Sequence, residues 1–459
     1  MTKDMTRGNP TGVILQFIIP ILLGLLLQQV YNLVDTMIVG KFVGLDALGG
    51  VGSTGSLNFL VLGSCVGLSM GFGIPVANAF GAGEESQLRR YAANSIYLCA
   101  AASVVVMAIV LVFCREILLA MHTTPETYDY AYDYIYWIFW GIPLLMLYNL
   151  TATMIRAVGD SRSPLIFLAI AAALNVVLDL VFILVFHMGV AGAAWATNLS
   201  QGISGVLCLF YIRRKLPIFR FRPGELAFRG QEAARLLANG FPMALQYFIT
   251  AIGSITLQSA VNSLGTTYVN ALAAGGKIAQ MLQCPFEALG PAMATYTGQN
   301  VGARRLSRIR GGFRVTVLLS VIFAAVYVAV AWFFTPAISM LFLQAPDEAL
   351  IALIRQFLLV VGLSSWSLGL VNGYRFSIQG MGYAHLAILS GVTEMVARVA
   401  VALVLVPWLG YLGACLGSPT AWVLADCFLL PTAYWCLGKL RRQLEPASGE
   451  QDGQNFAGV

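Results

Sequence analysis

Charge is what this sequence most clearly lacks. Only 10% of its 459 residues are Asp, Glu, Lys or Arg, whereas 58% are hydrophobic and the mean hydropathy is +0.78. A soluble domain is typically about 25% charged. A chain with so little charge cannot cover a water-exposed surface with polar groups. The composition therefore excludes an ordinary soluble protein and indicates that the chain is surrounded largely by lipid.

The motifs of common catalytic and cofactor sites are also absent from the sequence. Its three histidines are scattered, none of its eight cysteines forms a CxxC pair, and it contains no HExxH motif. It has no G-x-x-x-x-G-K-[ST] phosphate-binding loop and no polar stretch long enough for a nucleotide-binding domain. We therefore predict that the protein is not an enzyme, holds no prosthetic cofactor, has no zinc-type metal site and does not use ATP directly.

What the sequence does contain is a series of apolar runs, each near the roughly 20 residues that cross a bilayer. The first run has no cleavage site after it, so we expect a retained helix and not a signal peptide. We predict twelve spans, at about 13–38, 53–80, 92–114, 132–156, 164–187, 190–214, 236–263, 271–299, 313–335, 353–380, 384–406 and 411–437.

The basic residues alternate between the predicted loops as the positive-inside rule requires. If the N-terminus is cytoplasmic, the inner loops contain Arg89, Arg90 and the arginine-rich stretch 304–314, whereas the outer loops contain only Lys41 and Arg115 as positive charges. This pattern predicts both termini in the cytoplasm of a multi-pass protein of the cell (inner) membrane. It also accounts for the net charge of +6 without a nucleic-acid partner.

The two halves of the chain repeat one another at an offset of 221–223 residues. The anchors are prolines and glycines at matching positions: Pro20 and Pro242, Gly159 and Gly382, and Gly189 and Gly410. Six helices per repeat insert both halves in the same orientation, with a pathway between or within them. We expect an all-α membrane protein of two pseudo-symmetric six-helix lobes: an N-lobe (1–214), a cytoplasmic linker (215–235), a C-lobe (236–440) and a disordered cytoplasmic tail (441–459).

Polar side chains inside the first predicted span share one stripe of the helix. They are Gln28, Tyr31, Asn32 and Asp35, and their spacing places them within about 100° of one another. A charge near the bilayer centre costs roughly 2.5–3.5 kcal/mol on insertion scales. Such a stripe therefore indicates a face that points into the protein.

The fifth and sixth predicted spans add Asn175 and Asp179, one turn apart, and Thr197 and Gln201. Asp179 and Asp35 cannot both stay charged in a low dielectric without a counter-ion, so one binds a proton or a cation lies between them. Carboxylate, amide and hydroxyl oxygens suit Na⁺ or H⁺. A purely structural role in joining helices is the better interpretation for Asn175 or Thr197 alone, and coupling is the better one for the acid pair.

The second half offers a weaker set of polar candidates. Glu287 lies between two prolines of the eighth span, and Glu394 and Arg398 lie one turn apart on the eleventh. For that pair, self-neutralisation and a functional site are equally good interpretations. We expect Arg375, near a helix end, to extend toward the membrane surface.

Over about residues 10–440 the sequence resembles the multidrug and toxic compound extrusion (MATE) transporters. The resemblance rests on PILLGLLLQQVYNLVDTMIVGKFVGLDALGGVG in the first span, AVGDSRSP before the fifth and GQNVGARR after the eighth. It implies a V-shaped fold of two lobes that exports cationic or amphipathic organic compounds in exchange for Na⁺ or H⁺.

The resemblance also implies roles for individual residues. Its cation site maps onto Asp35, Asn175, Asp179 and Thr197, and its first-helix bend maps onto Pro20. Gln28 and Tyr31 match substrate-pathway positions, and we place Asn32 and Gln201 beside them. The seventh span lacks the acid that some members carry there, which concentrates coupling in the first half.

We expect a monomer in the lipid bilayer whose partners are small organic cations or amphipathic drugs. The alternative is a flippase for a lipid-linked cell-envelope precursor, which shares this architecture. That function would favour a larger and strongly cationic cavity.

Overall fold

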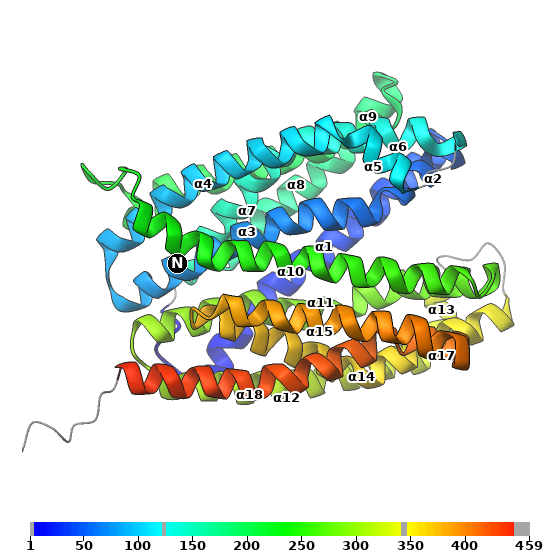
Figure 1. Ribbon diagram of the computed structural model, residues 1–459. Coiled ribbons are helices and arrows are strands. Elements are labelled where there is room, and N and C mark those ends of the chain that lie inside the picture. The colour runs from blue at the N-terminus through cyan, green and yellow to red at the C-terminus, as the bar shows by residue number, and fades with distance from the viewer. Residues whose placement is uncertain (1–3, 122–124, 341–346, 445–459) are drawn as a thin grey trace, which may run out of the picture.

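The computed structural model describes residues 4–121, 125–340 and 347–444, and the regular structure in these residues is helical (Figure 1). The first half contains α1 (Pro10–Phe42), α2 (Leu45–Ser53), α3 (Gly55–Ala82), α4 (Glu85–Val112), α5 (Cys114–Ala120), α6 (Pro125–Trp140), α7 (Ile142–Ala157), α8 (Arg162–Leu180) and α9 (Gly189–Lys215). The second half contains α10 (Gly230–Asn262), α11 (Thr266–Gly302), α12 (Leu306–Phe333), α13 (Thr335–Ser339), α14 (Glu348–Gly380), α15 (Ala384–Ala400), α16 (Val406–Leu409), α17 (Tyr411–Cys415) and α18 (Gly417–Leu444).

The predicted all-helical membrane fold is confirmed. In the described part of the chain, nine helices are long and apolar enough to cross a membrane, or ten if α6 and α7 form one span bent by 48°. α9 and α11 coincide with the sixth and eighth predicted spans and have 27 and 37 residues, but they carry more polar side chains. The total of twelve therefore stays a prediction. Most of the predicted tail, from residue 445 on, lies outside the described residues.

The span predicted over 132–156 is not continuous, because the helix breaks at Gly141. The Gly141 N–H bonds to the carbonyl of Ile138 instead of Trp137, and the side chain of Asn198 donates to the freed Trp137 carbonyl at 2.6 Å. Gly141 also packs directly against Asn198, which leaves no room for a Cβ. This side-chain insertion is a usual cause of a helix bend.

Several other boundaries differ from those predicted, among them the starts of α4 and α12, which begin at Glu85 and Leu306. The span predicted over 411–437 is interrupted between α17 and α18, at Leu416. α10 begins at Gly230, earlier than predicted, so the segment between α9 and α10 covers only residues 216–229.

The internal repeat extends to the backbone. Three glycine pairs have matching positive φ angles: Gly44 and Gly265 (134° and 107°), Gly159 and Gly382 (86° and 87°), and Gly189 and Gly410 (58° each). Glycine occupies these positions because left-handed conformations are costly for other residues. π-helical turns also recur, at Val181–Val185 after α8 and Val401–Leu405 after α15.

The helices form two packed layers, with α1 passing from one to the other (Figure 1). One hydrophobic cluster is built on the first half and contains Phe72 and Phe139, and the other is built on the second half and contains Phe286. Phe17 near the start of α1 belongs to the second-half cluster, whereas Val39 near its end belongs to the first-half cluster. α1 therefore links the two cores.

The layers meet tightly at the end of the molecule where α1 begins. The Met5 N–H donates to Gln299 Oε1 at 2.9 Å, and Gln299 Nε2 donates to the Ala157 carbonyl at 2.8 Å. Arg308 Nη1 donates to the Gly8 carbonyl at 2.8 Å, and Met5 is fully buried. The residues that precede α1 thus join both halves at this end.

The segment between α9 and α10 is held against α4 by a buried ion pair. Arg89 Nε donates to Glu225 Oε2 at 2.6 Å and Nη2 donates to Oε1 at 3.1 Å, while the Arg222 N–H donates to Glu225 at 2.8 Å. The hydrogen bonds from Arg89 lower the pKa of the Glu225 carboxyl to about 2. The connection between the halves is therefore docked on α4.

Replacement of Glu225 by Gln should lower the melting temperature of the purified protein at neutral pH. The loss should correspond to about 1–3 kcal/mol, because the guanidinium of Arg89 loses its two-point partner. A depressed pKa stabilises the fold above the ordinary value, so the difference from wild type should shrink as pH falls from about 4.5 toward about 2. Glu85→Gln is the matched control: Glu85 also binds Arg89 but its side chain is 57% exposed, so its loss should cost less. An equal loss in both variants would contradict this account.

Candidate functional site

Two acidic side chains meet inside the first half. Asp35 lies on α1 and Asp179 lies on α8 directly before the π-helical turn, and both are buried. Their carboxyl groups are close enough to interact directly. Even so, Asp35 Oδ1 and both Asp179 oxygens have no hydrogen-bond partner. The structure thus brings together the two acids that the sequence singled out, and no cationic side chain among the described residues pairs with them.

An amide and a hydroxyl lie beside the acid pair. Asn175, one turn before Asp179 on α8, donates from Nδ2 to Thr197 Oγ1 of α9 at 3.4 Å, and its Oδ1 has no partner. The buried Tyr134 of α6 is within electrostatic range of both acids. Sequence reasoning could not single out Tyr134, because it is one of many aromatic residues in α6.

The predicted pathway residues divide into two groups. Gln28 and Gln201 both lie near the buried Tyr31 side chain, where α1 faces α9. Tyr31, Thr197 and Gln201 help to line a small cavity of about 10 Å³, which has room for about one water molecule. The structure leaves Asn32 exposed and outside this group.

The side chains around the acid pair place several oxygen atoms close together. Asp35, Asp179 and Asn175 together supply four buried oxygens without a partner, and oxygen-only sets suit a hard cation or a proton. In the described residues no group of three or more His, Cys, Asp or Glu side chains could hold a metal ion. The chemistry of the site therefore fits reversible binding of Na⁺ or H⁺ better than a tightly held transition metal.

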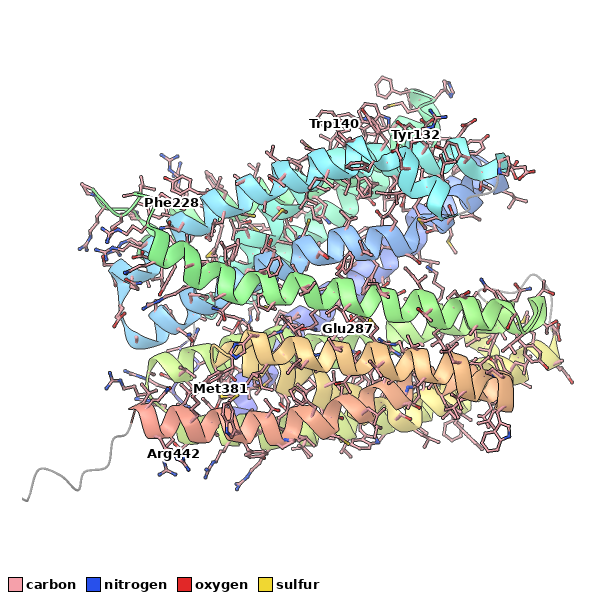
Figure 2. The ribbon with its side chains drawn as sticks, in the orientation of Figure 1. Tyr132, Trp140, Phe228, Glu287, Met381 and Arg442 are labelled. Atoms are coloured by element: carbon pink, nitrogen blue, oxygen red, sulfur yellow. The ribbon has the colours of Figure 1, made fainter. Side chains whose placement is uncertain are left out.

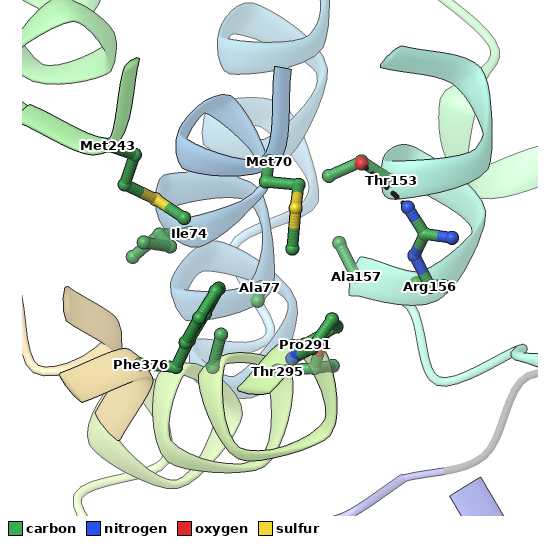
Figure 3. A pocket seen from close by; sticks show the side chains of 12 residues that line it. Met70, Ile74, Ala77, Thr153, Arg156, Ala157, Met243, Pro291, Thr295 and Phe376 are labelled. Atoms are coloured by element: carbon green, nitrogen blue, oxygen red, sulfur yellow. Dashed lines mark hydrogen bonds between the residues drawn. The ribbon is translucent and has the colours of Figure 1, made fainter. Parts of the chain in front are cut away.

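A larger cavity of about 470 Å³ lies between the two halves. Pro20 and Gln28 of α1 line it on one side, and Glu287 of α11 lines it between the layers, where Figure 2 labels it. It adjoins a pocket of about 20 Å³ lined by Arg156 and Phe376, in which Arg156 donates to Thr153 Oγ1 at 3.1 Å (Figure 3). α1 thus borders both the acid pair and the cavity.

The second half contains a buried charged group on the cavity wall. Arg375 of α14 pairs with Glu394 of α15 and donates from Nε to Ser390 Oγ at 2.9 Å. Glu394 also accepts from Arg398 Nη2 at 3.3 Å. The prediction that Arg375 extends toward the membrane surface was wrong, because it is buried with this acid. The predicted Glu394–Arg398 pair is present and is shared with a second arginine.

A family model, MatE, matches the chain twice, over residues 20–181 and 242–404. A probable multidrug resistance protein of Bacillus subtilis, YpnP, is 30% identical over 431 residues, which cover 92% of this chain and 95% of that protein. A probable multidrug resistance protein of Thermotoga maritima, NorM, is 26% identical over 400 residues and 85% of each chain. A solved structure of a multidrug resistance MATE family transporter in an outward-facing conformation has a TM-score of 0.88 at 20% identity, covering 96% of this chain and 99% of that one.

Asp179→Asn should raise the melting temperature in Na⁺-free buffer at neutral pH. The amide removes one of two adjacent unpartnered acids and can donate to the other, a gain of about 1–3 kcal/mol. Asp160→Asn is the matched control, because the buried Asp160 carboxylate accepts hydrogen bonds from Ser163 and Tyr211 and should lose stability. If Asp179→Asn also destabilises the protein, the acid pair has a structural role.

Proposed function

The chain belongs to the MatE family of multidrug efflux transporters, and from that premise we propose that it exports cationic or amphipathic organic compounds in exchange for Na⁺ or H⁺. The observation that carries the proposal is the pair Asp35 and Asp179, buried near one another with no cationic partner in the part of the chain that the structure describes. An uncompensated charge at this depth is costly. A proton or a sodium ion that enters and leaves the pair during transport accounts for its presence.

In this proposal α1 transmits the state of the acid pair to the cavity. The helix carries Asp35 near its far end, Gln28 on the cavity wall, and Pro20, where an interior proline lacks the N–H of the helical ladder and permits a bend. Binding of a proton or Na⁺ by the two acids would favour one conformation of α1, and release of that ion would favour another conformation. Ion and substrate would thereby compete through the shape of one helix.

The cavity suits an amphipathic molecule. Phe59, Leu368 and Trp422 supply apolar surface, and Glu287 is accessible from the cavity and suits a positively charged group. A membrane potential of 100 mV supplies about 2.3 kcal/mol per charge, which supports roughly fiftyfold accumulation. One coupled ion would therefore suffice for a substrate without net charge, whereas one-for-one exchange with a monovalent organic cation moves no net charge and would draw on the concentration gradient of the ion.

We place both termini in the cytoplasm of the cell (inner) membrane, in a protein that acts as a monomer. The end at which Met5 and Gln299 join the two halves would then face the cytoplasm. Arg305 and Arg308 at this end fit the positive-inside rule. The docked segment at Glu225 would move with α4 while the halves rock against one another.

A flippase for a lipid-linked precursor is the second candidate, favoured by Arg156, Arg375 and Arg398 on the cavity wall. Glu287 and Glu394 line the same cavity and offset two of these three charges. The cavity is therefore less cationic than we expect for a flippase that carries a polyanionic head group.

Cells that express Asp35→Asn or Asp179→Asn should lose most efflux of a fluorescent organic cation, because neither variant can load and release the coupling ion. Asp46→Asn, which alters an exposed acid on α2, should retain efflux. Surface expression of each variant must match wild type. Efflux at the wild-type rate in both acid-pair variants would show that Asp35 and Asp179 do not couple ion movement to transport.

Proteoliposomes that hold the purified protein and a dye should release the dye when one ion gradient is applied. A Na⁺ pulse at fixed pH and a pH pulse at fixed Na⁺ separate the two coupling ions. We expect one pulse to drive release and Asp179→Asn to abolish that response. Equal release with no gradient would show that transport is passive.

A further inference from the structure

In the buried charged group of the second half, two arginines share one ion-pair partner, Glu394. Glu394 offers one oxygen to each arginine, Oε1 to Arg375 and Oε2 to Arg398. The two guanidinium groups are close enough to repel one another. One carboxylate therefore serves two arginines in a region where an uncompensated charge is costly.

The two arginines are not equally satisfied. Arg375 uses Nη2 on Glu394 and Nε on Ser390, and it is also within electrostatic range of Asp426. Arg398 has one hydrogen bond, from Nη2 at 3.3 Å, and its Nη1 is buried without a partner. The Arg398 side chain is only 7% exposed. A guanidinium has five N–H donors, so most of its capacity is unused.

The neighbouring acids do not supply the hydrogen-bond partners that Arg398 lacks. Asp426 of α18 accepts from Ser367 Oγ at 2.5 Å, interacts with Arg375 and does not line the cavity. Glu287 lines the cavity but forms no ion pair with a described residue. Arg398 itself lines the cavity, and a rotation of its guanidinium would turn the unpartnered Nη1 toward a molecule bound there.

We propose that Arg398 is a subsite for the anionic group, a carboxylate or a phosphate, of an amphipathic substrate. Glu394 and Ser390 hold the adjacent Arg375 in place, and the planar guanidinium of Arg398 matches either group with two parallel hydrogen bonds. Glu287 on the same cavity receives the positively charged end. The favoured substrates are thus zwitterionic amphiphiles, a conclusion that rests on the proposed use of this cavity for transport.

Two dyes that differ only at the acid test the subsite. Rhodamine B has a free carboxylate beside its cationic ring system, and its ethyl ester lacks that charge. Binding to the full-length protein is followed by fluorescence anisotropy in phosphatidylcholine nanodiscs, with empty nanodiscs subtracted. We expect wild type to prefer the free acid by about tenfold or more, the value of a charged hydrogen bond. Arg398→Gln should remove this preference without weakening ester binding.

Two more variants keep the test decisive. Arg398→Lys retains the charge without the planar fork and should retain part of the preference. Glu394→Gln removes the competing carboxylate and should increase affinity for the free acid, even if Arg398→Gln does not fold. The proposal is wrong if wild type shows no preference, or if the preference is unchanged in Arg398→Gln and Glu394→Gln.

Adding phosphatidylglycerol to the nanodiscs identifies the source of the anion. If an anionic lipid occupies Arg398, the lipid should abolish the wild-type preference by competition. If a soluble amphiphile is the natural occupant, the preference should persist. Asp35→Asn should leave dye discrimination intact, so failure of coupling and failure of this subsite give different results.

Discussion

The cost of burying an ionisable group without a partner is the constraint on which this structure depends. Ion pairs with hydrogen bonds offset this cost for Arg89 and Glu225, and for Glu394, which contacts two arginines. The exceptions that concern transport are the carboxyl pair Asp35 and Asp179 and the Nη1 group of Arg398. Because such groups are costly when unsatisfied, their partners are best sought among ions and substrates that come and go.

The path of α1 connects these features. Its first turns pack in the second-half core, its middle borders the cavity, and its far end holds Asp35 against α8. Met5, which precedes its start, is hydrogen-bonded to Gln299 of the second half. A change of charge at Asp35 therefore acts on a helix that contacts both cores, and this provides a physical route from ion binding to cavity access.

The sequence was sufficient where a local rule decided the outcome. Apolar length predicted most of the helices, the repeat paired Gly189 with Gly410, and the cost of buried charge predicted that Asp35 and Asp179 face the protein interior, where the structure places them. It was insufficient where a distant contact decided. The break at Gly141 depends on the side chain of Asn198, and burial of Arg375 depends on Glu394 from another helix. The position of Tyr134 near the acid pair and the exposure of Asn32 depend on the rotation of each helix about its own axis relative to its neighbours. The periodicity of the sequence does not determine that rotation.

The central claim is that substrate and coupling ion exclude one another through the acid pair. The most direct test counts the protons or Na⁺ ions that purified protein releases when it binds rhodamine B, in weakly buffered solution with and without Na⁺. The account predicts release from wild type and none from the Asp35→Asn/Asp179→Asn double variant at equal dye binding. Dye binding by wild type without release of either ion, or equal release from the double variant, would contradict it.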